Sequence, residues 1–286
     1  MLSESAVALI RDVFSRPDLF RHAHRIRRRE VAWRPSEPSA VFEHSAIVLS
    51  EEELLAELPR PALHADAAAP FTLVASRSLP DHHFGTRTAE AFPVTLKPGT
   101  DAAACCIESF PQGWLFLVPN GPATAWLLSV GVGDLLAESR IIAPRIVSRQ
   151  PAAGRFPCYP AIAQPLTGPD WLACGSAAMA FDPICGDGTA HAVREAVLAA
   201  AAVRAAQDGE PWDLVRAHYE SRMILGFRRH LALAVSFYRS GHGGAWWKAE
   251  ADAAAEGILW CDQQAHAFGP PRYRLDGSAL CRMEER

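Results

Sequence analysis

The residues best suited to chemistry lie in one stretch, residues 175–189, which reads Gly-Ser-Ala-Ala-Met-Ala-Phe-Asp-Pro-Ile-Cys-Gly-Asp-Gly-Thr. Gly186 and Gly188 carry no Cβ, so the backbone there can take a positive φ and approach a flat ligand closely. Pro183 stiffens the approach to these glycines. The free N–H groups and the dipole at the start of a following helix would favour an electron-rich or anionic group. On physical grounds alone, the stretch could equally be a plain connection.

The elements expected around this stretch are a short buried strand before it and a long helix after it. The strand is predicted at residues 172–174 and the helix at residues 189–207, which are rich in alanine. Two more helices are predicted at residues 211–238 and 245–258, followed by a polar tail.

The middle of the chain carries the most regular strand pattern. Residues 102–110, 114–118 and 124–130 are apolar runs separated by short spacers that contain glycine and proline. Such spacing is typical of antiparallel hairpins. We therefore interpret residues 71–132 as an antiparallel sheet, and residues 135–142 as a helix packed on it.

The N-terminal part of the chain predicts helices and short strands. Residues 4–15 have apolar side chains on one side of a helix. Ser50 and Glu53 have the spacing of a capping box, which begins a second helix. Prolines in residues 59–70 predict a linker or a tight loop.

Residues 175–189 and the helix that follows resemble a known motif. Gly-Asp-Ala-Ala, then Asp-Pro, then Gly-x-Gly and an alanine-rich helix form the second FAD motif of the flavin-dependent monooxygenases and the tryptophan-halogenase-like flavoproteins, and this sequence matches it in order and spacing. Ser176 stands where the family usually has Asp, so its hydroxyl lacks charge assistance in a hydrogen bond to a ribityl group. The resemblance implies FAD as cofactor, bound by Gly175, Ser176, Asp182, Pro183, Gly186, Asp187, Gly188 and Thr189.

A second resemblance lies in the strand Gly-Trp-Leu-Phe-Leu-Val-Pro at residues 113–119. It is similar to the strand that crosses the substrate sheet of this superfamily, although the halogenases carry a second Trp where this chain has Phe116. Strand alternation places Trp114 and Phe116 on one face. With Trp246, which follows a glycine-rich loop, these two residues are the candidate substrate contacts, and core packing is the alternative for all three.

The resemblance implies a mixed α/β fold (α/β, or α+β), in which an antiparallel substrate-type sheet packs on a partial FAD-binding, glutathione-reductase-like α/β layer with C-terminal helices. We expect three segments. Residues 1–60 would be N-terminal helices and short strands left from the FAD domain, residues 61–150 the sheet, and residues 151–286 the second FAD motif and the C-terminal helices.

The family's proteins begin with a strand and a Gly-x-Gly-x-x-Gly loop that holds the ADP pyrophosphate. The start of this sequence has no such segment, and Gly131-Val132-Gly133 lacks the third glycine and is interpreted as a turn. We therefore expect that the chain starts late or has lost this site, which places FAD binding in question.

Composition narrows the function classes. The 286 residues are 49% hydrophobic with a net charge of −4, which is typical of a globular protein and argues against a nucleic-acid partner. Seven cysteines without regular spacing predict reduced thiols in a cytoplasmic protein, and no apolar run reaches membrane-spanning length. The His82-His83 pair lacks further ligands at metal-binding spacing, so no metal is expected. An incomplete parallel sheet would expose an edge, which predicts self-association or a protein partner.

Two function hypotheses follow. The first is a flavin-dependent oxidoreductase of the monooxygenase or halogenase-like class, in which reduced FAD reacts with oxygen and an aromatic or electron-rich small molecule is the substrate. The second is a non-catalytic, truncated or degenerate flavoprotein relative that acts as a binding or partner protein. No residue stands out as a catalytic acid or base. Glu108 and His191 are weak candidates, and Arg77 and Arg87 could contact flavin or an anionic substrate or form ion pairs.

Overall fold

The computed structural model describes residues 1–35, 37–59, 71–186, 188–268 and 272–283. The chain divides into two compact units. Unit 1 comprises Met1–Arg60, Gly85–Tyr159 and Val235–Asp252, and unit 2 comprises Pro61–Phe84, Pro160–Ala234 and Ala253–Arg286. This division differs from the three consecutive segments expected from the sequence, because each unit is assembled from three separate stretches of the chain.

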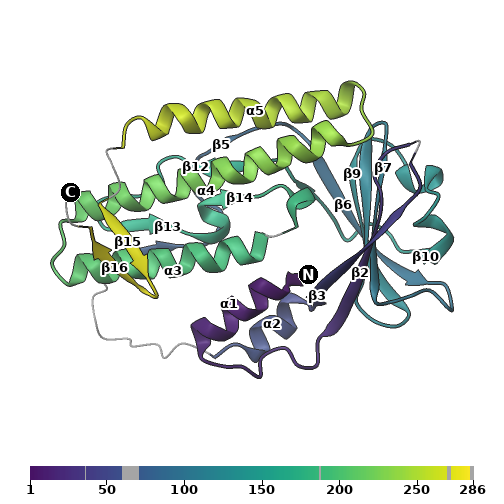
Figure 1. The fold of residues 1–286 in the computed structure, drawn as a ribbon, viewed down its shortest axis with the longest axis horizontal. Coiled ribbons are helices and arrows are strands. Elements are labelled where there is room, and N and C mark those ends of the chain that lie inside the picture. Colours follow the sequence, from purple (N-terminus) through teal and green to yellow (C-terminus); the bar gives the residue numbers. More distant parts are fainter. Residues whose placement is uncertain (36, 60–70, 187, 269–271, 284–286) are drawn as a thin grey trace. The chain divides into compact units, whose positions relative to one another are not determined.

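Unit 1 is built on a sheet to which nine strands of the described residues belong (Figure 1). The order is β1-β3-β2-β7-β8-β9-β6-β10, and β11 also pairs with β6. Only the β2–β7 pair is parallel, and the other pairs are antiparallel. The strands are β1 (Leu2–Ser3), β2 (His24–Ala32), β3 (Ala40–Val48), β6 (Thr88–Leu96), β7 (Ala104–Phe110), β8 (Gly113–Pro119), β9 (Thr124–Gly131), β10 (Ile146–Arg149) and β11 (Gly154–Pro157).

The three predicted hairpin strands are confirmed as β7, β8 and β9, and their alternation gives the sheet two apolar faces. On one face Leu115 and Leu117 pack in a cluster with Cys106. On the other face Cys105 belongs to a second cluster, against which Phe116 packs. Adjacent residues of a strand thus supply opposite faces of the sheet, as the pleat requires.

The N-terminal helix of unit 1 is confirmed as α1 (Glu4–Phe14), and the predicted capping box begins α2 (Glu51–Glu57). The Ser50 hydroxyl accepts the Glu53 backbone N–H at 3.1 Å, and the Glu53 carboxylate accepts the Ser50 backbone N–H at 2.6 Å. The strand that precedes each helix, β1 before α1 and β3 before α2, joins the large sheet, and residues 1–59 are part of unit 1.

The helix expected at residues 135–142 is wrong in type and length. The structure has a short 3-10 helix, η1 (Leu135–Glu138), and a second one, η2 (Ala143–Arg145). Between them, the Glu108 carboxylate accepts the backbone N–H groups of residues 140, 141 and 142 at 2.8–3.3 Å. The buried carboxylate therefore takes hydrogen bonds that an α-helix would have made to its own carbonyls.

Unit 2 contains smaller sheets, so the expectation of one antiparallel sheet over residues 71–132 is wrong at its start. There β4 pairs in parallel with β13, and β5 pairs with β12 in a second sheet. Pairing between distant stretches decides sheet membership, and local patterns do not carry that information. The strands are β4 (Thr72–Val74), β5 (Asp81–His83), β12 (Ala161–Ala163), β13 (Trp171–Ala173), β14 (Met179–Ala180), β15 (Tyr273–Asp276) and β16 (Ala279–Arg282).

The three C-terminal helices are confirmed, and the mixed α/β fold with them. They are α3 (Gly188–Gln207), α4 (Trp212–Ser240) and α5 (Ala245–Ala265), and the last two contribute residues to both units. The polar tail forms a hairpin of β15 and β16, which was not predicted, and β16 packs on α3. None of the helices in the described part of the chain has the length and apolar character needed to span a bilayer.

Candidate functional site

The candidate cofactor segment of unit 2 runs from the end of β13 to the start of α3. After the strand, the chain makes a 3-10 turn, η3 (Gly175–Ala177), pairs briefly through β14, and makes a second 3-10 turn, η4 (Pro183–Cys185). The 20-residue helix α3 then begins at Gly188. The sequence therefore forms a strand, glycine turns and a helix in the order expected.

The glycines of this segment border open space. Gly175 has φ +58° and Gly186 has φ +70°, which are backbone conformations that side chains with a Cβ rarely adopt. A Cβ added at either of them, or at Gly188, would meet no atom within 4 Å. Thr189 is exposed beside them, and Asp187 lies outside the described residues. The first N–H groups of a helix lack intrahelical partners, so the start of α3 has backbone donors for a flat or anionic group.

Asp182 makes hydrogen bonds within the candidate cofactor segment and to α4. It is only 2% exposed, and its carboxylate accepts the Ile184 backbone N–H at 3.0 Å, which caps η4. Its backbone N–H donates to Nε2 of His230 on α4 at 2.8 Å. Pro183 occupies the first turn of η4, where its missing N–H costs nothing. These two residues hold the turn that ends at Gly186.

Ser176 and Arg77 line the same crevice. Its hydroxyl donates to the Ala75 backbone carbonyl at 3.0 Å, and it lines a narrow crevice of about 10 Å³ together with Arg77 and Asp81. Arg77 and Asp81 form a half-exposed ion pair at 4.0 Å. The structure therefore brings Arg77, which the sequence offered as a weak candidate, next to the predicted cofactor turn.

A buried carboxyl group lies beneath the same turn and was missed by the sequence interpretation. Glu195 on α3 is 5% exposed, and neither carboxylate oxygen has a hydrogen-bond partner of good geometry among the described residues. Burial raises its pKa to about 8, and the Gly175 backbone favours the ionised form in part. Its charge in turn raises the pKa of Cys174 and Tyr219, after their own burial. The group is therefore largely a neutral acid at pH 7.

The candidate substrate residues belong to unit 1. Trp114 is 1% exposed and packs in the sheet, whereas Phe116 is partly buried against the cluster that contains Cys105. Trp246 is partly buried, with its ring edge-on to Trp247 at 5.2 Å. Phe116 and Trp246 pack on other residues of unit 1, and substrate binding by the three side chains stays a prediction.

The other polar candidates are held in structural contacts. Arg87 forms a buried ion pair with Glu250 and lies over the Tyr238 ring, with 4.8 Å from guanidinium carbon to ring centroid. His191 stacks on Phe181 with ring centroids 4.4 Å apart.

The two histidines at residues 82–83 have different contacts. His82 stacks on Trp260 at 5.2 Å, and His83 lies 3.6 Å from Asp81. In the described ranges no group of three His, Cys, Asp or Glu side chains could hold a metal ion.

Several solved structures have a fold similar to that of this chain. The chain is similar to the peptidyl tryptophan dihydroxylase QhpG, with a TM-score of 0.71, 16% identity, and coverage of 99% of this chain and 77% of that one. It is also similar to the flavin-dependent halogenase CmlS, with a TM-score of 0.66 and 14% identity over 93% of this chain, which spans 64% of the length of CmlS. The myxobacterial FAD-dependent chondrochloren halogenase CndH gives a TM-score of 0.66 at 13% identity, covering 93% of this chain and 80% of that one.

Neither the protein-family models nor the curated protein sequences give a match to this chain. At identities of 13–16% the likeness to these structures is one of fold.

Proposed function

Because the chain has the fold of flavin-dependent halogenases and related FAD flavoproteins, we propose that it is a flavin-dependent oxidoreductase that binds FAD at residues 175–189. The observation that carries the proposal is the start of α3, where a Cβ added at Gly186 or Gly188 would meet no atom within 4 Å and a 20-residue helix begins. A helix start of this kind stabilises negative charge, and the pyrophosphate and the reduced ring of FAD carry it.

Two turns of the segment would hold the cofactor together with the start of α3. The Gly175 turn and the hydroxyl of Ser176 would contact its polar chain, with the Arg77 guanidinium lining the same crevice. The Asp182–Pro183 turn would keep Gly186 in its left-handed conformation. FAD would supply the redox chemistry with oxygen, and the protein would position it and exclude water.

The finer proposal concerns the reaction. A monooxygenase- or halogenase-like reaction on an aromatic or electron-rich small molecule fits the fold, since the similar proteins are described as halogenases and as a peptidyl tryptophan dihydroxylase. Trp114, Phe116 and Trp246 are the proposed apolar contacts for such a substrate. Aromatic side chains would bind a flat substrate through stacked or edge-on contacts.

The proposed cofactor site is tested by filling the open space at the start of α3. The variant Gly188→Val adds a side chain whose Cβ would meet no atom of the protein within 4 Å but which would collide with a bound group. Helix propensity gives Val no penalty relative to Gly, so we expect an unchanged thermal unfolding midpoint. FAD affinity, followed by quenching of flavin fluorescence, should fall at least about tenfold.

The matched control is Gly154→Val, because a Cβ at Gly154 on β11 also meets no atom within 4 Å and that strand lies in unit 1. This variant should bind FAD as the unchanged protein does. Equal FAD affinity in Gly188→Val and Gly154→Val would contradict the assignment of the site to the start of α3.

A further inference from the structure

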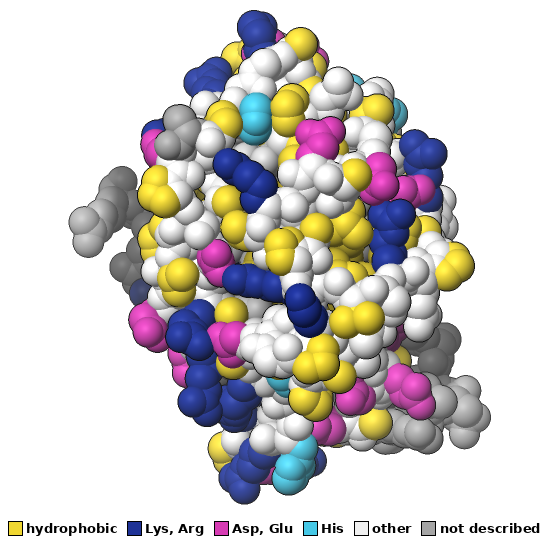
Figure 2. All heavy atoms as spheres, turned by 90° about the vertical axis from the view of Figure 1, so that its right-hand side faces the viewer, with side chains coloured by type: hydrophobic (Ala, Val, Ile, Leu, Met, Phe, Trp, Pro, Cys, Tyr) yellow, Lys and Arg dark blue, Asp and Glu magenta, His cyan; other side chains and the backbone are white. Residues whose placement is uncertain are grey.

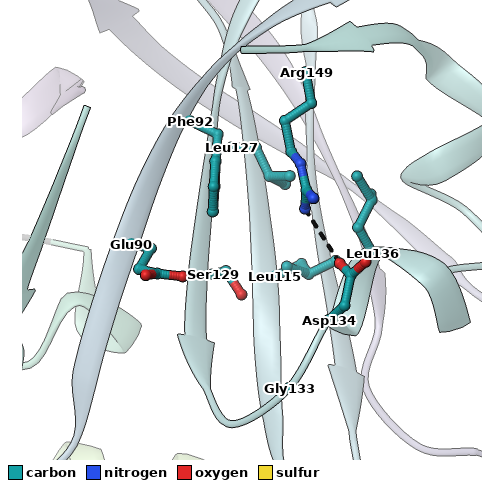
Figure 3. Close-up of a pocket in the computed structure, with 9 residues that line it drawn as sticks. All are labelled: Glu90, Phe92, Leu115, Leu127, Ser129, Gly133, Asp134, Leu136 and Arg149. Atoms are coloured by element: carbon teal, nitrogen blue, oxygen red, sulfur yellow. Dashed lines mark hydrogen bonds and ion pairs between the residues drawn. The ribbon is translucent and has the colours of Figure 1, made fainter. Parts of the chain in front are cut away.

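A cavity of about 300 Å³ lies in unit 1, on the sheet face that bears Leu115 and Leu127 (Figure 3). Trp114 and Phe116, the proposed substrate contacts on β8, point to the opposite face because side chains alternate along a strand. The volume is at the lower end of the roughly 300–1,000 Å³ range of small-molecule sites. All residues that line this cavity belong to unit 1, and none of them is among the proposed cofactor or substrate contacts.

The sheet register places the polar and apolar lining side by side. Glu90 on β6 lies directly opposite Ser129 on β9, and Phe92 lies opposite Leu127. Leu115 on β8 is the other neighbour of Ser129. Figure 3 shows the Glu90 carboxylate and the Ser129 hydroxyl together on one side of the cavity, next to this apolar surface.

On the side of the cavity across from Glu90, the positive charge of Arg149 is already paired with a carboxylate. The Arg149 guanidinium donates to the Asp134 carboxylate at 3.1 Å, and its central carbon lies 4.8 Å from the centroid of the Phe92 ring. Figure 3 draws this ion pair as the dashed line across from Glu90. Arg149 therefore has a carboxylate partner and an aromatic partner, and the cavity offers no unmatched cation to an anionic ligand.

Glu90 is the unmatched charge of the lining. Among the described residues its carboxylate has neither a hydrogen bond nor an ion pair, and the Ser129 hydroxyl is also without a partner. Arg155 on β11 lies opposite Glu90, but its guanidinium donates to the Thr88 hydroxyl at 3.2–3.3 Å. The Glu90 carboxylate and the Ser129 hydroxyl line one cavity with the Phe92 ring, and both oxygens can accept hydrogen bonds from a cationic donor.

Figure 2 looks onto the right-hand side of Figure 1, where β10 lies. Hydrophobic side chains gather near the middle of this face, among Lys, Arg, Asp and Glu side chains.

We propose that this cavity binds a small primary amine with a compact apolar body. The ammonium group donates to the Glu90 carboxylate and the Ser129 hydroxyl. The apolar body lies against the partly buried side chains of Phe92 and Leu136 of η1, over the buried Leu115 and Leu127.

The test is a ligand series of equal shape and different charge, titrated into the full chain and followed by backbone amide shifts in NMR. The probes are phenethylamine, neutral 2-phenylethanol and anionic 3-phenylpropionate. We expect phenethylamine to bind about tenfold more tightly than 2-phenylethanol, because a charge-assisted hydrogen bond adds about that factor. The anion should bind most weakly, and the shifts should be largest at Glu90 and Ser129.

Two variants test whether the charge of Glu90, and not the shape of the cavity alone, determines which probe binds most tightly. Glu90→Gln should bring phenethylamine down to the affinity of 2-phenylethanol, while Glu43→Gln, an exposed carboxylate on β3 of the same sheet, should change nothing. Equal binding of the three probes to the unchanged protein, or tightest binding of the anion, would overturn the proposal. So would an unchanged preference for phenethylamine in Glu90→Gln. The probe series on the unchanged protein decides the matter even if a variant folds poorly.

Discussion

Glu195 carries its carboxyl group on the buried face of an alanine-rich helix, where the ionised form is strongly disfavoured in free energy. The buried residues of α3 include Glu195, Leu198, Ala199 and Ala202. These positions are spaced three and four residues apart, so helical periodicity alone would place Glu195 on the apolar side. That signal was available in the sequence. The lack of a partner was not, because it depends on the Gly175 turn and on α4.

The first prediction is that Glu195→Gln stabilises the protein more at high pH than at low pH. In the unfolded chain the carboxyl ionises near its ordinary pKa of 4.5, and in the folded protein burial raises the pKa to about 8. Between these values the folded state binds more protons, so the free energy of unfolding falls as pH rises. At about 1.4 kcal/mol for each pH unit, the penalty removed by Gln reaches on the order of 5 kcal/mol above pH 8.

Thermal or urea unfolding of the chain without added FAD, at pH 5 and at pH 8.5, measures this difference. Glu256→Gln on the exposed side of α5 is the matched control and should shift stability little at both pH values. The same effect of Glu195→Gln at pH 5 and pH 8.5 would mean that the carboxyl is already ionised in the folded protein at pH 5.

At the scale of elements, one carboxylate decides the shape of a loop. The Glu108 carboxylate is 1% exposed and accepts the Ser139 hydroxyl at 2.6 Å, in addition to the backbone N–H groups of residues 140–142. Apolar residues at 135, 136, 141 and 142 suggested a helix. Local periodicity cannot show that the Glu108 carboxylate, on a strand about 30 residues earlier, accepts the backbone N–H groups of this loop. The weak catalytic candidate Glu108 is therefore accounted for by these hydrogen bonds.

The second stability prediction follows from these contacts. Glu108→Gln replaces one acceptor by an NH₂ group that faces backbone donors, which leaves buried groups unsatisfied. We expect a loss of about 2–3 kcal/mol in the free energy of unfolding, measured by urea denaturation. Glu138→Gln, an exposed substitution in η1, should change it by less than about 0.5 kcal/mol. A loss of the same size in both variants would contradict the role of Glu108 in the loop.

Local sequence patterns predicted the helices and strands better than they predicted which strands pair with one another. The capping box at Ser50, the hairpin strands at residues 102–130 and the three C-terminal helices were expected from periodicity and turn residues. Sheet membership was not, because β2 pairs in parallel with β7, and β4 with β13, across about 75 and 100 residues of chain. Such pairings depend on contacts that no local window contains.

At the scale of the whole molecule, the candidate residues fall into two groups. The proposed cofactor residues belong to unit 2, and the proposed substrate contacts and the amine cavity belong to unit 1. The order of the cofactor segment along the chain could be predicted because it follows from a contiguous motif. The amine cavity could not, because its lining comes from β6, β8, β9, β10 and η1, whose register only the folded sheet defines.

The most direct test of this account is an FAD titration of the purified chain, followed by the visible flavin spectrum and by fluorescence quenching. The account predicts saturable binding with a dissociation constant in the micromolar range. Binding absent at about 100 µM FAD, where free energies near −5 to −6 kcal/mol would still be detected, would contradict the central claim that residues 175–189 of this chain form a flavin site.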